Sequence, residues 1–262
     1  MSYKISLGQS SASDAASLFQ QQGALWIDQL FSRRFVQRLS KVYFRKYASL
    51  SQQELESRYA CVGDQRYMIT TEVKGKFNSP DLYANGHLMP ILQELLGRHF
   101  VISSFGSVIA FPGAGAQSVH MDYPPLYEDE STCTSLPPHA ITLVVPLVDL
   151  NEKTGSTSLW LGTHNRVGAR EQLQKLVETG SRRESVFPSA KLGDAYLMDF
   201  RLTHAGMANQ SEIARPILYI VYSRPWFDES LNFSEQPRIN LSRKQYGKVP
   251  KALRYLFAGA AK

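Results

Sequence analysis

The chain has 262 residues, of which 43% are hydrophobic and 11% aromatic, enough for one globular domain with a large core. Its formal net charge is +6, but the basic residues are scattered and no nucleic-acid-binding motif is present, so we expect no nucleic-acid partner. No apolar run reaches the roughly 18 residues of a membrane span, and the first ten residues lack the apolar segment of a secretory signal. We therefore expect a cytoplasmic protein without membrane association.

Helix caps and apolar periodicity predict a mainly helical layer in the first 99 residues. Serine side chains that can accept backbone hydrogen bonds begin three of these helices, and a glycine ends two of them. The expected elements are a helix over residues 13–22 capped by Ser13 and ended by Gly23, a strand over 24–27, helices capped by Ser32 and Ser51, and a helix over 89–96 ended by Gly97.

From residue 100 onward the pattern changes to short strands separated by glycine, proline and asparagine turns. Strands are expected over residues 100–111, 141–150, 156–161, 195–200 and 217–222, with a helix over 171–179 and a loop over 123–138. Such strands are typical of an antiparallel barrel or sandwich. We expect a mainly β fold, a double-stranded β-helix (jelly-roll, cupin-like) with a helical N-terminal layer. Residues 1–262 would form one domain, with the jelly-roll core over 100–226 and a C-terminal extension over 227–262.

One segment carries the pattern of a metal site. His120 and Asp122 are two residues apart, so on an extended segment their side chains project from the same face. His204 is the best candidate for a third ligand, and His164 is its rival. Two histidines and one carboxylate that leave other positions open form the facial triad of non-haem Fe(II) oxygenases.

The residues around this triad carry a family resemblance. Gln117 precedes His120 by three positions, Gly193-Asp194 opens the strand before His204, and Arg215 follows it by eleven (215 − 204). This ordered set resembles the phytanoyl-CoA dioxygenase family of Fe(II)/2-oxoglutarate-dependent oxygenases. The similarity extends over residues 17–226 and includes the opening segment 19–27 and the segment 159–164, where Leu161 replaces the usual proline.

The resemblance implies a role for each site residue. His120, Asp122 and His204 would hold Fe(II), leaving positions for 2-oxoglutarate and O2, with ascorbate as the reductant in vitro. Arg215 would pair bidentately with the distal carboxylate of 2-oxoglutarate, which its planar fork suits better than a lysine would. The Gln117 amide and the Thr142 hydroxyl would lie beside the cosubstrate, also as cofactor-binding groups.

Asp122 further narrows the expected reaction. Related halogenases replace this carboxylate with a small residue, so the aspartate implies hydroxylation, desaturation or ring formation of a small organic metabolite, with secondary metabolism as the favoured setting. Two other classes stay open: a cupin-like enzyme that uses Zn or Mn at the same ligands, and a non-catalytic small-molecule-binding protein. The sequence leaves a monomer or a homodimer open.

Overall fold

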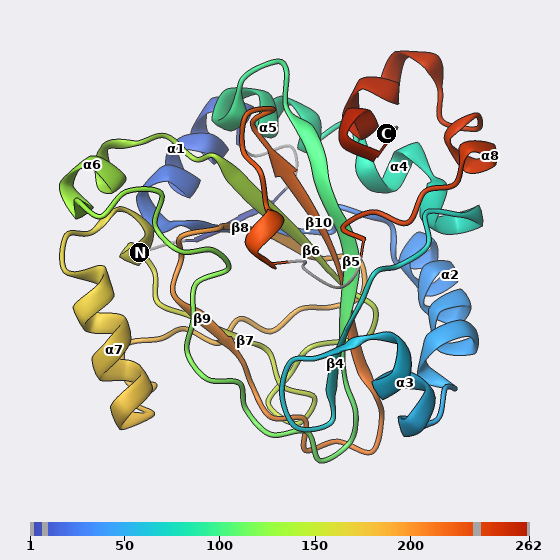
Figure 1. Cartoon of the computed structure of the whole chain (residues 1–262), viewed down its shortest axis with the longest axis horizontal. Coiled ribbons are helices and arrows are strands. Elements are labelled where there is room, and N and C mark those ends of the chain that lie inside the picture. The colour runs from blue at the N-terminus through green and yellow to red at the C-terminus, as the bar shows by residue number, and fades with distance from the viewer. Residues whose placement is uncertain (1–2, 7–9, 233–236, 261–262) are drawn as a thin grey trace.

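The computed structural model describes residues 3–6, 10–232 and 237–260. An eight-stranded sheet dominates it, in the order β1–β2–β8–β6–β10–β5–β4–β3, and a second sheet pairs β7 with β9. Figure 1 shows strands of the large sheet at the centre of the molecule, with helices around them. In chain order the strands are β1 (Lys4–Ser6), β2 (Ala24–Asp28), β3 (Ala60–Cys61), β4 (Arg66–Ile69), β5 (Val101–Ala110), β6 (Ala140–Pro146), β7 (Thr157–Leu159), β8 (Ala195–Asp199), β9 (His204–Gly206) and β10 (Arg215–Ser223).

The α-helices of the described residues are α1 (Ala12–Gln22), α2 (Arg33–Tyr43), α3 (Gln52–Arg58), α4 (Pro80–Tyr83), α5 (Leu88–Leu96), α6 (Glu130–Ser135), α7 (Ala169–Thr179) and α8 (Arg243–Tyr246). Side-chain caps begin α1, α2, α3, α6 and α8 among them. Ser32 and Ser51 cap α2 and α3, as predicted. The predicted cap of α1 at Ser13 is wrong. Ser11 caps this helix because Asp14, three residues later, accepts a hydrogen bond from the Ser11 backbone and completes a capping box.

The central strand β10 shows how the large sheet separates two environments. It lies between β5 and β6, antiparallel to both. Because side chains alternate along a strand, Leu218, Ile220 and Tyr222 face the main hydrophobic core. The alternate residues Arg215, Ile217, Tyr219 and Val221 line a cavity. The sheet therefore buries one face under helices and uses the other to build a site.

The main core joins distant parts of the chain. Phe19 of α1 and Leu92 of α5 belong to the same buried cluster as Phe105 of the sheet. Leu256 and Phe257, from the C-terminal 3-10 segment Lys251–Ala260, belong to it as well. This shared core supports our proposal that residues 1–262 form a single domain.

Two segments differ from the sequence-based expectation. The strand expected over 24–27 is present as β2, but the first 99 residues also contain β1, β3 and β4, which were not predicted and which join the large sheet. In β4 the charged Arg66 hid the strand pattern, since it faces the cavity while Tyr67 and Ile69 face the core. The segment 123–138 was expected to be a loop, yet it contains α6, whose first turn is capped by Asp129. Among the described residues, none of the helices is long and apolar enough to cross a membrane.

Candidate metal centre and cosubstrate pocket

The two histidines are brought together by the backbone. His120 and His204 exchange both main-chain hydrogen bonds, with N···O distances of 2.9 and 2.8 Å, as an isolated antiparallel bridge. Their ring centroids lie 4.3 Å apart. The segment around His120 is thus not a strand of the large sheet, and it is fixed beside β9 by this bridge. Backbone pairing therefore sets the distance between the two imidazoles.

Hydrogen bonds also select the tautomer of both rings. His120 Nδ1 lies 2.8 Å from the Ser118 carbonyl oxygen, and His204 Nδ1 lies 2.9 Å from the Leu202 carbonyl oxygen. A carbonyl can only accept, so each Nδ1 carries the proton and donates it. In the neutral ring this leaves the Nε2 lone pair free to bind a metal.

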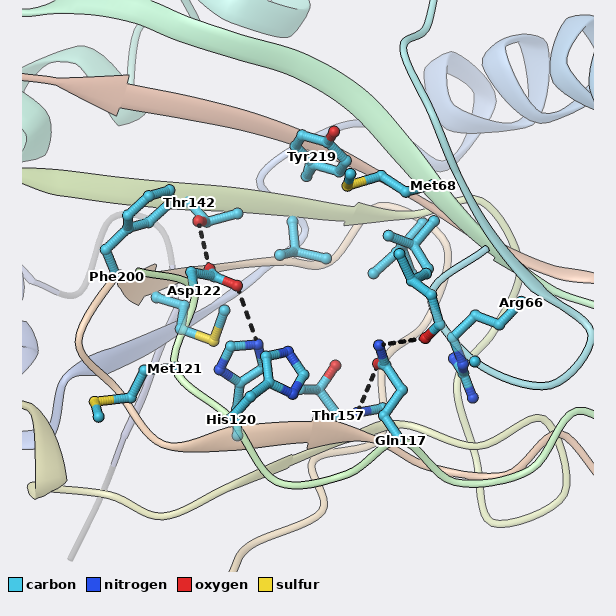
Figure 2. A pocket seen from close by; sticks show the side chains of 18 of the residues that line it. Arg66, Met68, Gln117, His120, Met121, Asp122, Thr142, Thr157, Phe200 and Tyr219 are labelled. Atoms are coloured by element: carbon cyan, nitrogen blue, oxygen red, sulfur yellow. Dashed lines mark hydrogen bonds and ion pairs between the residues drawn. The ribbon is translucent and has the colours of Figure 1, made fainter. Parts of the chain in front are cut away.

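Asp122 completes the cluster from the same segment as His120. Its Oδ1 lies 3.4 Å from His204 Nε2, and its Oδ2 accepts a hydrogen bond from Thr142 Oγ1 at 3.3 Å. One ligand atom from each of His120, Asp122 and His204 lies within 4.8 Å of the others. Figure 2 shows the carboxylate of Asp122 between Thr142 and His120. The three predicted ligands thus converge on one point.

The charges in this cluster favour a cation. Burial and the neighbouring His204 lower the pKa of His120 to about 4, so its imidazole is neutral near pH 7. Burial alone would raise the pKa of Asp122, but the two imidazoles and the Thr142 hydroxyl hold it below its usual value. Burial alone would lower the pKa of His204, whereas the Asp122 carboxylate raises it. A neutral imidazole, an ionised carboxylate and a second imidazole paired with it suit Fe(II) or a similar divalent metal.

A cavity of about 630 Å³ adjoins this cluster. Its size is typical of pockets that hold small organic ligands. Beyond the three ligands, its wall includes residues of β4, β5, β6, β8 and β10, chiefly Arg66, Met68, Val108, Thr142, Val144, Tyr196, Met198, Arg215, Ile217, Tyr219 and Val221. The cavity is mainly apolar, and its few polar groups therefore carry the specificity.

Arg215 lies in this wall, as the sequence predicted, and it is 1% exposed. Its Nη2 donates to the Met207 carbonyl at 3.0 Å, and its Nε donates to the Thr154 carbonyl at 3.3 Å. Burial lowers the pKa of Arg215 to about 10, and no acidic side chain pairs with it among the described residues. His204 begins β9 and Arg215 begins β10, which belong to different sheets, and both side chains line the same cavity.

A second buried arginine was missed by the sequence analysis. Arg66 is fully buried, lines the same cavity, and donates from Nη2 to the carbonyls of Gly115 and Met207. Its Nε and Nη1 have no hydrogen-bond partner in the described structure. Burial and the nearby Arg215 lower its pKa to about 9. The guanidinium groups of Arg66 and Arg215 thus both donate to the Met207 carbonyl, and no carboxylate among the described residues pairs with them. Such a pair of buried cations forms a site suited to an anion.

The other two predicted cosubstrate residues are held by protein groups. Gln117 accepts a hydrogen bond from the Gly206 backbone and donates one to the Val62 carbonyl, so its amide links the His120 segment to β9 (Figure 2). Thr142 donates to the ligand Asp122. A contact of either side chain with 2-oxoglutarate remains a prediction.

The rival histidine lies elsewhere. His164 is buried with its Nε2 2.9 Å from the Gln20 carbonyl oxygen, against the end of α1, and it does not belong to the three-residue cluster. The Cβ of any larger residue at Gly23 would lie 2.5 Å from its ring, so His164 packs against the turn that ends α1. His164 therefore has a structural role at the end of α1.

The fold and site define a class, the metal-dependent oxygenases built on a double-stranded β-helix. Residues 19–217 match the phytanoyl-CoA dioxygenase (PhyH) family, and the chain belongs to this family. It is thereby an oxidoreductase of the Fe(II)/2-oxoglutarate-dependent oxygenases, which confirms the class inferred from the sequence.

Solved structures show the same fold at low sequence identity. HygX from Streptomyces hygroscopicus, with nickel and 2-oxoglutarate bound, is 14% identical with a TM-score of 0.62, over 81% of this chain and 87% of HygX. The epimerase SnoN, in complex with Fe3+, alpha ketoglutarate and nogalamycin RO, is 13% identical with a TM-score of 0.58, over 81% and 83%. The non-heme monooxygenase ThoJ, as a nickel complex, is 15% identical with a TM-score of 0.57, over 80% and 77%.

Proposed function

We propose that this protein binds Fe(II) through His120, Asp122 and His204 and uses 2-oxoglutarate and O2 to oxidise a small organic metabolite. The convergence of two Nε2 lone pairs and one carboxylate beside a buried, uncompensated pair of arginines supports this proposal most directly. Bound iron and 2-oxoglutarate would supply the oxidising chemistry, and the protein would supply orientation and an enclosed site.

The two arginines would make one end of the cavity positively charged. Arg215 would donate to the distal carboxylate of 2-oxoglutarate, and Arg66 would add a second positive charge at the same end. Burial strengthens such ion pairs because the surrounding dielectric is low, and it makes an empty site costly. The Asp122–Thr142 hydrogen bond would hold the carboxylate oxygen that faces away from His204, leaving the other oxygen for the metal.

The substrate would be a small molecule held in the rest of the cavity. Hydroxylation, desaturation and ring formation are each compatible with an aspartate in the metal cluster. HygX has also been solved with hygromycin B bound, and SnoN with nogalamycin RO. Both ligands are small organic molecules, which supports a small-molecule substrate for this protein. Its place in secondary metabolism remains a prediction. A cytoplasmic location and a monomeric or homodimeric state remain predictions from the sequence.

A two-stage measurement tests the proposal. Anaerobic addition of Fe(II) and then 2-oxoglutarate should produce the visible charge-transfer band of a metal-chelated keto acid, and O2 with ascorbate should then yield succinate. His204→Ala should lose both signals. His99→Ala, an exposed histidine outside the cavity, is the matched control and should retain both.

Absence of the band in the wild type would overturn the proposal. It would favour one of the two other classes, which the same samples separate. Tight binding of Zn or Mn without 2-oxoglutarate would indicate a cupin-like enzyme of another kind, and no metal binding would indicate a non-catalytic binding protein.

A further inference from the structure

One acidic side chain in the cavity has no part in the function proposed above. Glu229 follows β10 in a loop, is 2% exposed, and lines the same cavity as the metal cluster. Its Oε2 accepts hydrogen bonds from Ser104 Oγ at 2.5 Å and from Ser103 Oγ at 3.3 Å. The side chain of Asn232 also hydrogen-bonds to this carboxyl. The cavity thus contains a carboxyl group as well as its arginines.

The partners of Glu229 are all neutral. No lysine, arginine or histidine forms an ion pair with it in the part of the chain that the structure describes. Asp199, another fully buried carboxylate, shows the usual solution: its oxygens pair with the Arg201 guanidinium at 2.8 and 2.9 Å. A buried carboxyl without a cation is costly when it is ionised. Burial and the nearby Asp122 accordingly raise the pKa of Glu229 to about 7.

A second polar group lies near this carboxyl. Tyr219 lines the cavity from β10, and its buried hydroxyl has no hydrogen-bond partner among the described residues. Burial raises the pKa of Tyr219, and the negative charge of Glu229 adds to this effect, so the phenol is neutral. Gly106 on the paired strand β5 makes room for this ring, because any Cβ there would collide with the hydroxyl. This region therefore offers a carboxyl group and an unpaired hydroxyl to a ligand.

We propose that Glu229 is a specificity-determining residue that recognises a basic nitrogen on the substrate, with the ammonium group donating to its carboxylate. The inference rests on the proposed function, in which the arginines take the anionic cosubstrate. The substrate would then be an amine or another nitrogen base. The substrate cation would form the ion pair that Glu229 lacks. The arginines are also positive and would repel this cation, which disfavours the reversed orientation of the substrate.

Three probes of one shape separate this charge preference from simple fit. Cyclohexylmethylamine, cyclohexylmethanol and cyclohexanecarboxylate share an apolar ring and differ in charge at neutral pH. Each would be titrated at pH 7.5 into the anaerobic Fe(II)·2-oxoglutarate protein, and binding would be followed by calorimetry and by the change in the charge-transfer band. For the wild type we expect the amine to bind at least about tenfold more tightly than the other two, since a charge-assisted hydrogen bond contributes this much.

The variants identify the group responsible. Glu229→Gln keeps the size of the side chain and its serine contacts but not its charge, and it should lose the preference for the amine. Asp228→Asn removes the neighbouring carboxylate, which is 65% exposed and paired with Arg238, and it should keep the preference. The proposal is overturned if the wild type binds the amine no more tightly than the alcohol, including if it binds none of the probes. It is also overturned if Glu229→Gln keeps the preference.

The failure of this inference can be told apart from failure of the proposed function. The charge-transfer band is recorded before any probe is added. If the band is missing, the oxygenase proposal itself fails. If the band is present and the amine is not preferred, only the role of Glu229 fails, and its carboxyl is then a structural group held by Ser103 and Ser104.

Discussion

His120 and His204 exchange both of their backbone hydrogen bonds, so the imidazoles of the metal cluster are placed by main-chain pairing and not by side-chain packing. The bridge uses backbone atoms alone. Loss of one imidazole should therefore remove the metal site while leaving the local backbone in place.

His120→Ala tests this separation. We expect the variant to fold with a far-ultraviolet circular dichroism spectrum like that of the wild type, and to lose Fe(II) affinity by at least about tenfold, because one of three ligands is gone. Equilibrium dialysis with Fe(II) under anaerobic conditions would measure the affinity. Unchanged metal affinity would show that His120 is not a ligand, and an unfolded variant would show that the ring supports the fold.

Replacement of Arg215 should affect 2-oxoglutarate and not the metal. Arg215→Lys keeps a positive charge but loses the planar fork, so we expect 2-oxoglutarate to bind about tenfold less tightly, with a larger loss in Arg215→Ala. Anaerobic titration of the charge-transfer band gives this affinity, and dialysis gives that of Fe(II). Equal affinity for 2-oxoglutarate in all three proteins would contradict the role assigned to this arginine.

The sequence predicted those site residues whose signal is local. The spacing of His120 and Asp122 and the order of His204 and Arg215 can be read along the chain, and the structure brings all four to one cavity.

The rest of the site depends on contacts that no local pattern encodes. Arg66 lies in a four-residue strand whose pairing with β5 decides which side chains face the cavity. Glu229 lies in a loop, and only the packing of that loop against Ser103 and Ser104 makes it an internal group. The Gln117 amide accepts a hydrogen bond from the backbone of Gly206, a contact between distant segments, and its place beside the cosubstrate remains a prediction.

Arg66 should lower the stability of the ligand-free protein and increase the stabilisation that Fe(II) and 2-oxoglutarate provide. Its guanidinium is buried without a carboxylate, so we expect Arg66→Met to leave the ligand-free protein as stable as the wild type or more stable, by up to about 2 kcal/mol. The rise in Tm on adding Fe(II) and 2-oxoglutarate should be smaller in the variant, because 2-oxoglutarate binds less tightly without this positive charge. Thermal unfolding with and without the ligands measures both. An equal rise in both proteins would remove Arg66 from the anion site.

Gly206 lies where a side chain would collide with two site residues. A Cβ there would overlap Gln117 Oε1 and lie 2.9 Å from Arg66 Nη1. We expect Gly206→Ala to lower the free energy of unfolding by about 1–3 kcal/mol and to weaken metal binding, since Gln117 must move away from β9. Gly115→Ala is the matched control, because no atom lies within 4 Å of the place that its Cβ would take. Urea unfolding should show a lower free energy of unfolding for Gly206→Ala but not for Gly115→Ala. An equal decrease in both variants would contradict the role assigned to Gly206.

Glu229 should make the stability of the metal-free protein depend on pH. Its pKa rises from 4.5 to about 7 on folding, so the folded state holds the proton more tightly than the unfolded chain does. The penalty is absent below about pH 4.5 and grows as the pH rises through 7. Relative to the wild type, Glu229→Gln should therefore become more stable as the pH increases from 5 to 8, by as much as about 3 kcal/mol. Urea unfolding of both proteins at these two pH values measures the difference, and a difference that stays constant would show that Glu229 ionises as freely in the cavity as in water.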